Sequence, residues 1–202
     1  MSVWLYGFCA VAFFILMPPF IQLWLGDSFL IDNVSFTLIV LNVYLLGQST
    51  IYNNARVAKG NFNKDKWIAF AQALVNLVVS IIAANFLGLM GVYVGTVVSR
   101  MVTIILRPIM TYRFLFEKSP WEYFKQFLIN LIIIALACAI TYIATYYILL
   151  EVTIFTFIMA MIVVVLVPNL IMLVCYFRTV EFKSLINRLK NLIKKKKVKN
   201  DE

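Results

Sequence analysis

Long apolar stretches separated by short polar connections make up most of this sequence. Each stretch is close to the length of about 20 residues that one helix needs to cross a bilayer. The first stretch lacks the basic start and the small-residue cleavage site of a signal peptide, so we count it as a crossing. The pattern predicts an all-α membrane bundle with six transmembrane helices, at residues 3–25, 34–52, 67–87, 91–107, 123–147 and 153–177.

The composition supports the same fold class. The chain of 202 residues is 63% hydrophobic and 13% charged, whereas soluble proteins average about 45–50% apolar and about 25% charged residues. These values exclude an ordinary soluble domain, and the high content of aliphatic and aromatic residues excludes a disordered chain. We expect residues 1–178 to form the transmembrane bundle and residues 179–202 to form a cytoplasmic basic tail.

Basic residues fall on alternate connections between the apolar stretches. The sequence has 18 Lys and Arg residues, and 17 of them lie in three regions. These regions are the connection between the second and third stretches, the connection between the fourth and fifth stretches, each with its flanking residues, and the segment after the sixth stretch. The charged residues of the other connections are Asp27, Asp32 and Glu151. Because Lys and Arg on short loops stay in the cytoplasm, both termini are predicted to be cytoplasmic. The net charge of +9 then follows from topology, and we expect no nucleic-acid partner.

Apolar residues recur at helical spacing between residues 180 and 193, with Lys and Arg among them. This pattern predicts an amphipathic interfacial helix on the inner membrane surface. The run that follows, Lys194, Lys195, Lys196 and Lys197, is expected to be drawn to anionic membrane lipids. A plain topology anchor is a better interpretation of this run than capture of a substrate headgroup.

No pattern in the sequence points to catalysis. Histidine is absent, and the three cysteines are isolated within apolar stretches. The sequence contains no metal-binding spacing, glycine-rich phosphate loop, nucleophile elbow or carboxylate pair. We therefore predict that the protein is not an enzyme and that it holds neither a metal nor a cofactor.

Polar side chains within three neighbouring stretches are the strongest candidates for a functional site. Arg100 lies near the centre of the fourth stretch, where an arginine costs at least about 2.5 kcal/mol. No stretch carries Asp or Glu in its interior, so we expect its partner to be another polypeptide or an anionic ligand such as a phosphate. The second to fourth stretches together predict a hydrophilic path lined by Asn42, Gln48, Ser49, Gln72, Asn76, Ser80, Tyr93, Thr96, Arg100 and Thr103.

The neutral members of this set also have a plainer interpretation. Ser, Thr, Asn and Gln in membrane helices often form hydrogen bonds to neighbouring helices, and each bond contributes about 0.6 kcal/mol. For any single Asn or Gln, that structural role is the better prediction. It does not extend to Arg100, because a cation within a bilayer needs an anion or water.

Three segments carry a resemblance to a known family: residues 18–29, 76–82 and 88–100. They resemble recurrent elements of the polysaccharide and O-antigen flippases, which belong to the multidrug/oligosaccharidyl-lipid/polysaccharide exporter superfamily. The most specific part is the glycine pattern at positions 88, 91 and 95. The resemblance covers most of residues 15–130.

The resemblance implies a two-lobed transporter that moves lipid-pyrophosphate-linked oligosaccharides across the bacterial inner membrane by alternating access. The sequence matches the carboxyl-terminal part of such a protein. We therefore expect a fragment, a truncated gene product, or a chain whose amino-terminal lobe is a second polypeptide. In this interpretation Arg100 meets the pyrophosphate and the neutral path residues meet sugar hydroxyls. The expected partners are membrane lipids, the lipid-linked glycan and the other lobe.

Two other function classes stay open. A cation or drug antiporter of the same superfamily is disfavoured, because such sites usually need a carboxylate within the membrane. A non-transporting scaffold would recruit glycan-synthesis enzymes through the basic tail. A polar lumen separates both transporters from the scaffold, and the charge of the substrate separates the flippase from the cation exporter.

Overall fold

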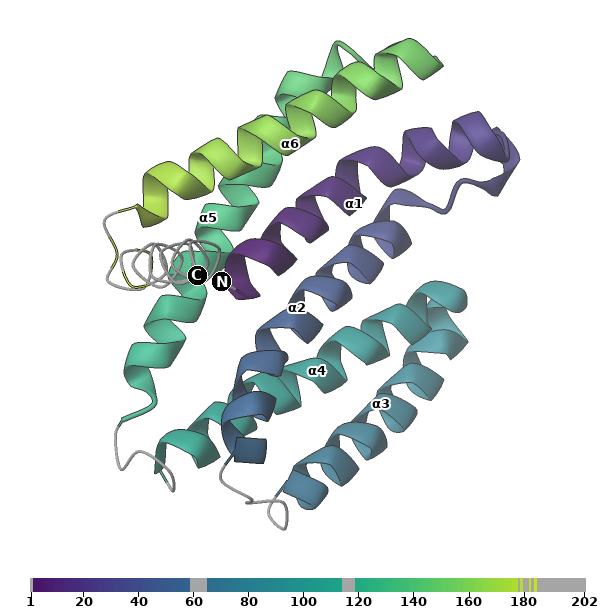
Figure 1. Cartoon of the computed structure of the whole chain (residues 1–202). Coiled ribbons are helices and arrows are strands. Elements are labelled where there is room, and N and C mark those ends of the chain that lie inside the picture. The colour runs from purple at the N-terminus through teal and green to yellow at the C-terminus, as the bar shows by residue number, and fades with distance from the viewer. Residues whose placement is uncertain are drawn as a thin grey trace, which may run out of the picture.

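The computed structural model describes residues 2–58, 65–113 and 119–177, with residues 179, 182 and 184; the side chains of residues 2, 49–58 and 65 lie outside this description. Within these ranges, all regular secondary structure is helical, as the sequence predicts (Figure 1). The elements are α1 (Ser2–Trp24), the 3₁₀ turn η1 (Asp27–Phe29), α2 (Asn33–Ala58), α3 (Asp65–Leu87), α4 (Leu89–Thr111), α5 (Trp121–Tyr146) and α6 (Ile154–Tyr176).

Five of the described helices, α1, α3, α4, α5 and α6, are long and apolar enough to cross a membrane. Such a set of helices fits a multi-pass membrane protein. α2 has 26 residues, and its described side chains, Asn33–Gln48, form an apolar stretch. The helix predicted at residues 34–52 is therefore present within α2.

The fourth helix is longer than the sequence predicts. Its expected end was Arg107, the residue before a proline, but α4 continues through Pro108 to Thr111. A proline inside a helix removes one intrahelical hydrogen bond. Membrane helices tolerate this loss because neighbouring groups satisfy the freed carbonyl. Pro108 is itself buried, so packing holds the helix together at this point.

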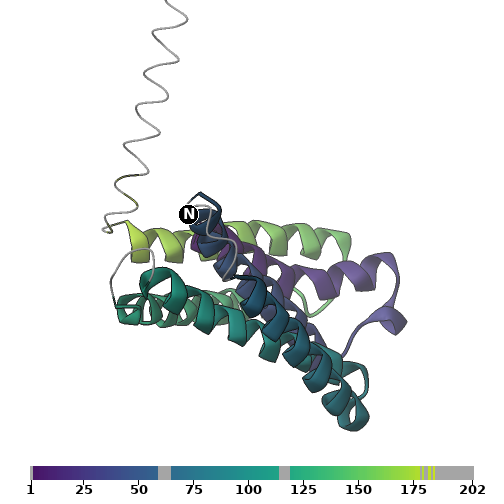
Figure 2. The same cartoon turned by 90° about the horizontal axis from the view of Figure 1, so that it is seen from below.

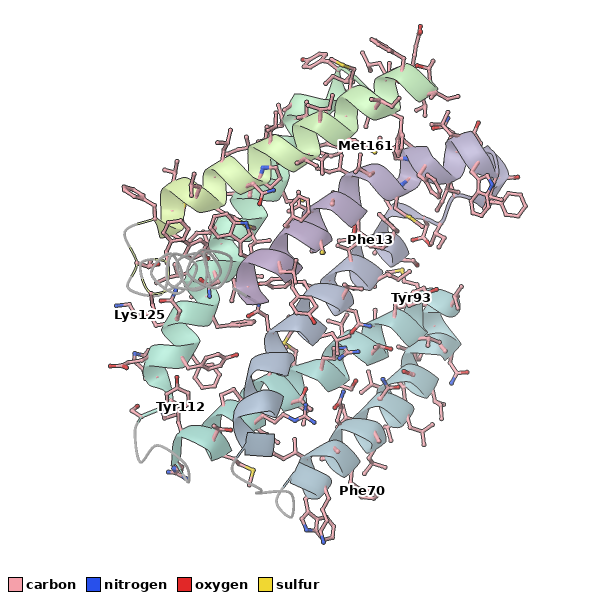
Figure 3. All side chains as sticks on the ribbon, viewed as in Figure 1. Phe13, Phe70, Tyr93, Tyr112, Lys125 and Met161 are labelled. Atoms are coloured by element: carbon pink, nitrogen blue, oxygen red, sulfur yellow. The ribbon has the colours of Figure 1, made fainter. Side chains whose placement is uncertain are left out.

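α1 lies at the centre of the bundle and packs against α2, α5 and α6 (Figure 1). α2 in turn packs against α4, and α4 carries α3 at the edge of the molecule. Most large apolar side chains outside the core are exposed, such as Phe70 on α3 (Figure 3), as expected for helices surrounded by lipid. The core contains Ala10, Val11, Ile15, Val40, Tyr44, Leu45, Ile104, Ile134, Val164 and Met172.

Successive helices run in opposite directions, so their connections gather at two ends of the bundle (Figures 1 and 2). The connections at residues 25–32, 88 and 147–153 lie at the end opposite to the start of α1. They carry Asp27, Asp32 and Glu151 and no Lys or Arg. The connections without Lys or Arg, which alternate with basic ones along the sequence, therefore lie together at one end of the described bundle.

Candidate functional site

Arg100 on α4 contacts α2, where its Nε donates a hydrogen bond to Asn42 Oδ1. Both residues are partly buried. Apart from Asp65, the first residue of α3, the three helices α2, α3 and α4 contain no Asp or Glu. The neutral amide orients the guanidinium but does not neutralise its charge. Arg100 is thus a partly buried cation without a counter-ion on its own helix or on α2.

The threonines that flank Arg100 form hydrogen bonds within α4. Thr103 is buried, and its hydroxyl donates to the Arg100 carbonyl at 2.8 Å. The Thr96 hydroxyl donates to the Val92 carbonyl at 2.9 Å. Such bonds to the preceding helical turn satisfy the hydroxyl donor locally. These two predicted path residues therefore have their donors satisfied within their own helix, and they keep acceptor lone pairs for another group.

The polar stripe of α3 forms hydrogen bonds to α4. Asn76 Nδ2 donates to Ser99 Oγ at 3.1 Å, and Ser80 Oγ donates to Asn76 Oδ1 at 3.4 Å. Ser99 is fully buried, and its own hydroxyl donates to the Thr96 carbonyl at 2.9 Å. Asn76 and Ser80, two residues of the predicted hydrophilic path, lie in the contact between α3 and α4. Ser99, which completes this network, is absent from the predicted set.

Small residues on α4 make that contact possible. Gly91, Gly95 and Ser99 follow one another at steps of four, so they lie on one face of the helix. A Cβ atom at Gly95 would lie 2.1 Å from Ser80 Oγ, and one at Gly91 would lie 2.3 Å from the carbonyl carbon of Ala83. This is the small-xxx-small packing by which membrane helices bring their backbones together. The glycine pattern thus closes the α3–α4 hairpin.

The other predicted path residues are dispersed. Tyr93 and Gln72 are partly buried on α4 and α3, and Figure 3 shows Tyr93 near the start of α4. Gln48 is buried on α2, whereas the Ser49 side chain lies outside the described set. The basic run Lys194, Lys195, Lys196 and Lys197, like the amphipathic helix predicted before it, falls outside the described residues.

Buried polar atoms without a partner also occur on α2 and α4. They are the Tyr44 hydroxyl, Gln48 Nε2 and Thr111 Oγ1, none of which has a hydrogen-bond partner among the described residues. Buried polar groups normally bind protein or ordered water. α2 and α4 therefore carry, besides Arg100 and Asn42, several polar atoms that are available to water or to a ligand.

A groove of about 920 Å³ lies in another part of the bundle, between α1, α2 and α5. None of the ten predicted path residues lines it. Its walls are mostly aliphatic and aromatic, so it differs in chemistry from the α2–α4 contact. The structure thus separates the buried cation from this large open space.

A second polar cluster, which sequence reasoning missed, joins α1, α5 and α6. Trp4 Nε1 donates to Asn169 Oδ1 at 2.7 Å. Asn130 Oδ1 accepts from the Tyr176 hydroxyl at 2.7 Å and from Gln126 Nε2 at 3.1 Å. The signal that singled out Asn76, an amide within an apolar stretch, applies equally to Asn130 and Asn169 and would have found them.

Comparisons with protein-family models, with curated proteins and with solved structures found no match for this chain.

Proposed function

We propose that this chain is part of a membrane transporter that carries an anionic, lipid-linked oligosaccharide across a bacterial inner membrane by alternating access. The observation that carries the proposal is Arg100, a partly buried guanidinium held by the neutral amide of Asn42. Charged residues within membrane helices are rare, and they mark substrate or ion pathways. A phosphate or pyrophosphate would supply the negative charge that this site lacks, through charge-assisted hydrogen bonds.

The distribution of polar groups supports a path on the α2 side of α4. On the α3 side, Gly91 and Gly95 pack against the α3 backbone and leave no room for a substrate. On the α2 side, Arg100 and Asn42 lie on the same two helices as Gln48, whose buried Nε2 has no hydrogen-bond partner among the described residues. The proposed path therefore contains fewer residues than the one predicted from the sequence. Asn76 and Ser80 are left out of it because they belong to the contact between α3 and α4.

We infer six crossings, with both termini in the cytoplasm and a basic interfacial tail on the inner leaflet. The absence of Lys and Arg from the connections at residues 25–32, 88 and 147–153 supports this orientation. A second lobe, on another chain or elsewhere in the same protein, belongs to the proposal because alternating access requires two halves.

The test compares Arg100→Ala, Arg100→Lys and Arg100→Glu with the control Arg113→Ala, whose side chain is exposed just beyond the same helix. Each variant replaces the native protein in its host cells, where protein accumulation and translocation of lipid-linked glycan are measured. We expect Arg100→Ala to accumulate normally but to lose translocation by at least about tenfold, equivalent to about 1.4 kcal/mol. Arg100→Lys should retain part of the activity, because a point charge attracts phosphate without a bidentate fork. Arg100→Glu should be inactive, and the control should match the native protein.

Three results would contradict the proposal. Full translocation by Arg100→Ala would remove the cation from the substrate path. Loss of accumulation in Arg100→Ala would make Arg100 a structural partner of an acid on the other lobe. Export of an organic cation that persists in Arg100→Ala would favour a cation antiporter.

A further inference from the structure

The pair formed by Arg100 and Asn42 lies on two helices that run in the same direction. α2 and α4 both begin at the end of the bundle where α1 ends, and they pack against each other (Figure 1). Arg100 is the middle residue of the 23 that form α4. At a rise of about 1.5 Å per residue, it lies about 16 Å from the start of this helix. That is about half of a hydrocarbon core about 30 Å thick. The protein must therefore supply polar surroundings for this cation, because the bilayer does not.

The hydrogen bond to Asn42 occupies one particular edge of the guanidinium. A guanidinium has five N–H donors, one on Nε and two on each Nη atom. It binds two oxygens of one anion either through Nε and one Nη atom or through both Nη atoms. Asn42 Oδ1 accepts the hydrogen bond from Nε. The edge that remains for a ligand is therefore the one formed by the two Nη atoms.

Both Nη atoms of Arg100 are accessible to a ligand. Among the described residues, the Arg100 side chain makes no hydrogen bond besides the one to Asn42. The Nη atoms are not fully buried, in contrast to the enclosed, unpartnered polar atoms of Tyr44, Gln48 and Thr111. An anion beside α4 can therefore reach four N–H donors of Arg100.

The charge that acts on Arg100 within the described part of the chain is that of a second cation. Arg107 follows seven residues later, about two turns along the same face of α4, and its charge acts on Arg100. The acid of α2, α3 and α4 is Asp65, at the first position of α3. The potential around the Nη atoms is therefore positive, and it favours an anion over a cation or an uncharged ligand.

We propose that Asn42 is a positioning residue that also determines the charge specificity of this site. Its amide oxygen holds the guanidinium by Nε, so that the two Nη atoms bind two oxygens of one phosphate or pyrophosphate group. Because an amide carries no charge, the full positive charge of Arg100 stays available to that ligand. The inference rests on the proposed function, since it concerns the same site, and it adds the residue that decides which charge the site accepts.

Asn42→Asp separates this role from a purely structural one. The substitution keeps the shape of the side chain, and a carboxylate accepts the same hydrogen bond from Nε. It also forms a charge-assisted pair with the guanidinium. An incoming phosphate would then meet a neutral pair instead of a cation. If Asn42 only held α2 against α4, Asn42→Asp would preserve function and Asn42→Ala would impair it. The proposed role predicts the opposite order.

The experiment compares Asn42→Asp and Asn42→Ala with the control Asn85→Asp. Asn85 is exposed near the end of α3, so the control adds the same charge away from the site. Membranes of the host cells are treated with phenylglyoxal, which modifies arginine side chains, in the presence and absence of inorganic pyrophosphate. Mass spectrometry measures the modification rates of Arg100 and of the exposed Arg113. Protein accumulation and glycan translocation are measured in the same cells.

In the native protein we expect pyrophosphate to slow the modification of Arg100 by at least about tenfold, equivalent to about 1.4 kcal/mol of binding free energy. The modification of Arg113 should not change. Asn42→Asp should accumulate normally but lose this protection and most of the translocation. Asn42→Ala should keep part of both, because the charge of Arg100 remains while its orientation is lost. Asn85→Asp should match the native protein.

The outcomes that overturn this inference differ from those that contradict the proposed transport. Native translocation by Asn42→Asp, with loss of translocation in Arg100→Ala, would leave transport standing and make Asn42 a structural residue only. Equal protection of Arg100 in the native protein and in Asn42→Asp would show that the charge at position 42 does not control binding. Absence of protection in native membranes would overturn the inference without any substitution. Full translocation by Arg100→Ala would instead contradict the proposed function itself.

Discussion

The α3–α4 and α5–α6 hairpins are both antiparallel pairs of apolar helices, but different contacts hold each pair together. In α3–α4 a single residue, Gly88, with φ 59°, separates the two helices. Gly95 then brings the backbones so close that a Cβ atom would meet Ser80. In α5–α6 a longer connection ends in a capping box formed by Thr153 and Thr156.

The second hairpin also depends on α1, which packs against both α5 and α6. A Cβ atom at Gly7 of α1 would lie 2.7 Å from Ile134 on α5 and 2.9 Å from Met172 on α6. The two hairpins therefore differ in how much backbone packing and polar side chains each contribute to the contact between their helices. In α3–α4 close backbone packing adds to the Asn76–Ser99 hydrogen bond, and Arg100 on α4 contacts α2. In α5–α6 the amide of Asn130 and the contacts with α1 join the two helices.

The largest expected effect comes from Gly95→Leu, which would force α3 and α4 apart. Overpacking of this kind costs about 3 kcal/mol, and here the nearest atoms include the backbone of Ser80, which cannot rotate away. The matched change on the other hairpin is Ala144→Leu, at an exposed position, where we expect an effect within about 0.5 kcal/mol. The free energy of unfolding in mixed detergent micelles measures both. Equal effects would show that the α3–α4 contact is not close-packed.

A smaller effect is expected from removing one amide in each hairpin. Asn130→Ala deletes an acceptor shared by Tyr176 and Gln126, and we expect a loss of about 1.5 kcal/mol. Asn76→Ala should cost only about 0.6 kcal/mol, because the Ser99 hydroxyl keeps its bond to the Thr96 carbonyl. The same unfolding measurement ranks the two variants. The reverse order would assign the larger polar contribution to α3–α4.

The smallest expected effect concerns pH at the starts of two helices. The backbone N–H of Ser35 donates to Asp32 Oδ2 at 2.8 Å, and this bond lowers the pKa of the Asp32 carboxyl below its ordinary value. The cap on α2 is therefore fully formed above about pH 4 and is lost as the pH falls through the lowered pKa. The start of α6 is capped by hydroxyl groups, which do not titrate in this range.

Hydrogen-exchange protection of the Ser35 and Thr156 amides between about pH 2 and pH 6 checks this contrast. Protection of Ser35 should fall with pH, and protection of Thr156 should stay constant. Asp32→Asn should abolish the pH dependence at Ser35. If the dependence persists in that variant, another group is responsible for it.

Much of the fold could be predicted because apolar length is a local property of the sequence. It located all the major helices, including α6, in which Thr156 and Asn169 are nearly the only polar residues. It failed at Pro108, where packing against neighbours overrides the usual end of a helix.

The candidate site could be predicted only in part. Arg100 and Asn42 were each identified as polar residues in apolar stretches, but their contact depends on how α2 and α4 are aligned. Ser99 was overlooked because a single serine is a weak signal, although it continues the four-residue steps of Gly91 and Gly95. The groove between α1, α2 and α5 had no signal at all, because α5 lies far from α1 and α2 in the sequence.

The central position of α1 has a consequence for the order of assembly. α1 is synthesised before every other described helix, yet Trp4 forms its hydrogen bond with Asn169, 165 positions later in the chain. α3 and α4 can pair as soon as both have left the ribosome, since their contacts are local. The face of α1 around Gly7 must wait in the membrane until α5 and α6 are made. The bundle is therefore completed when its last helices pack against its first.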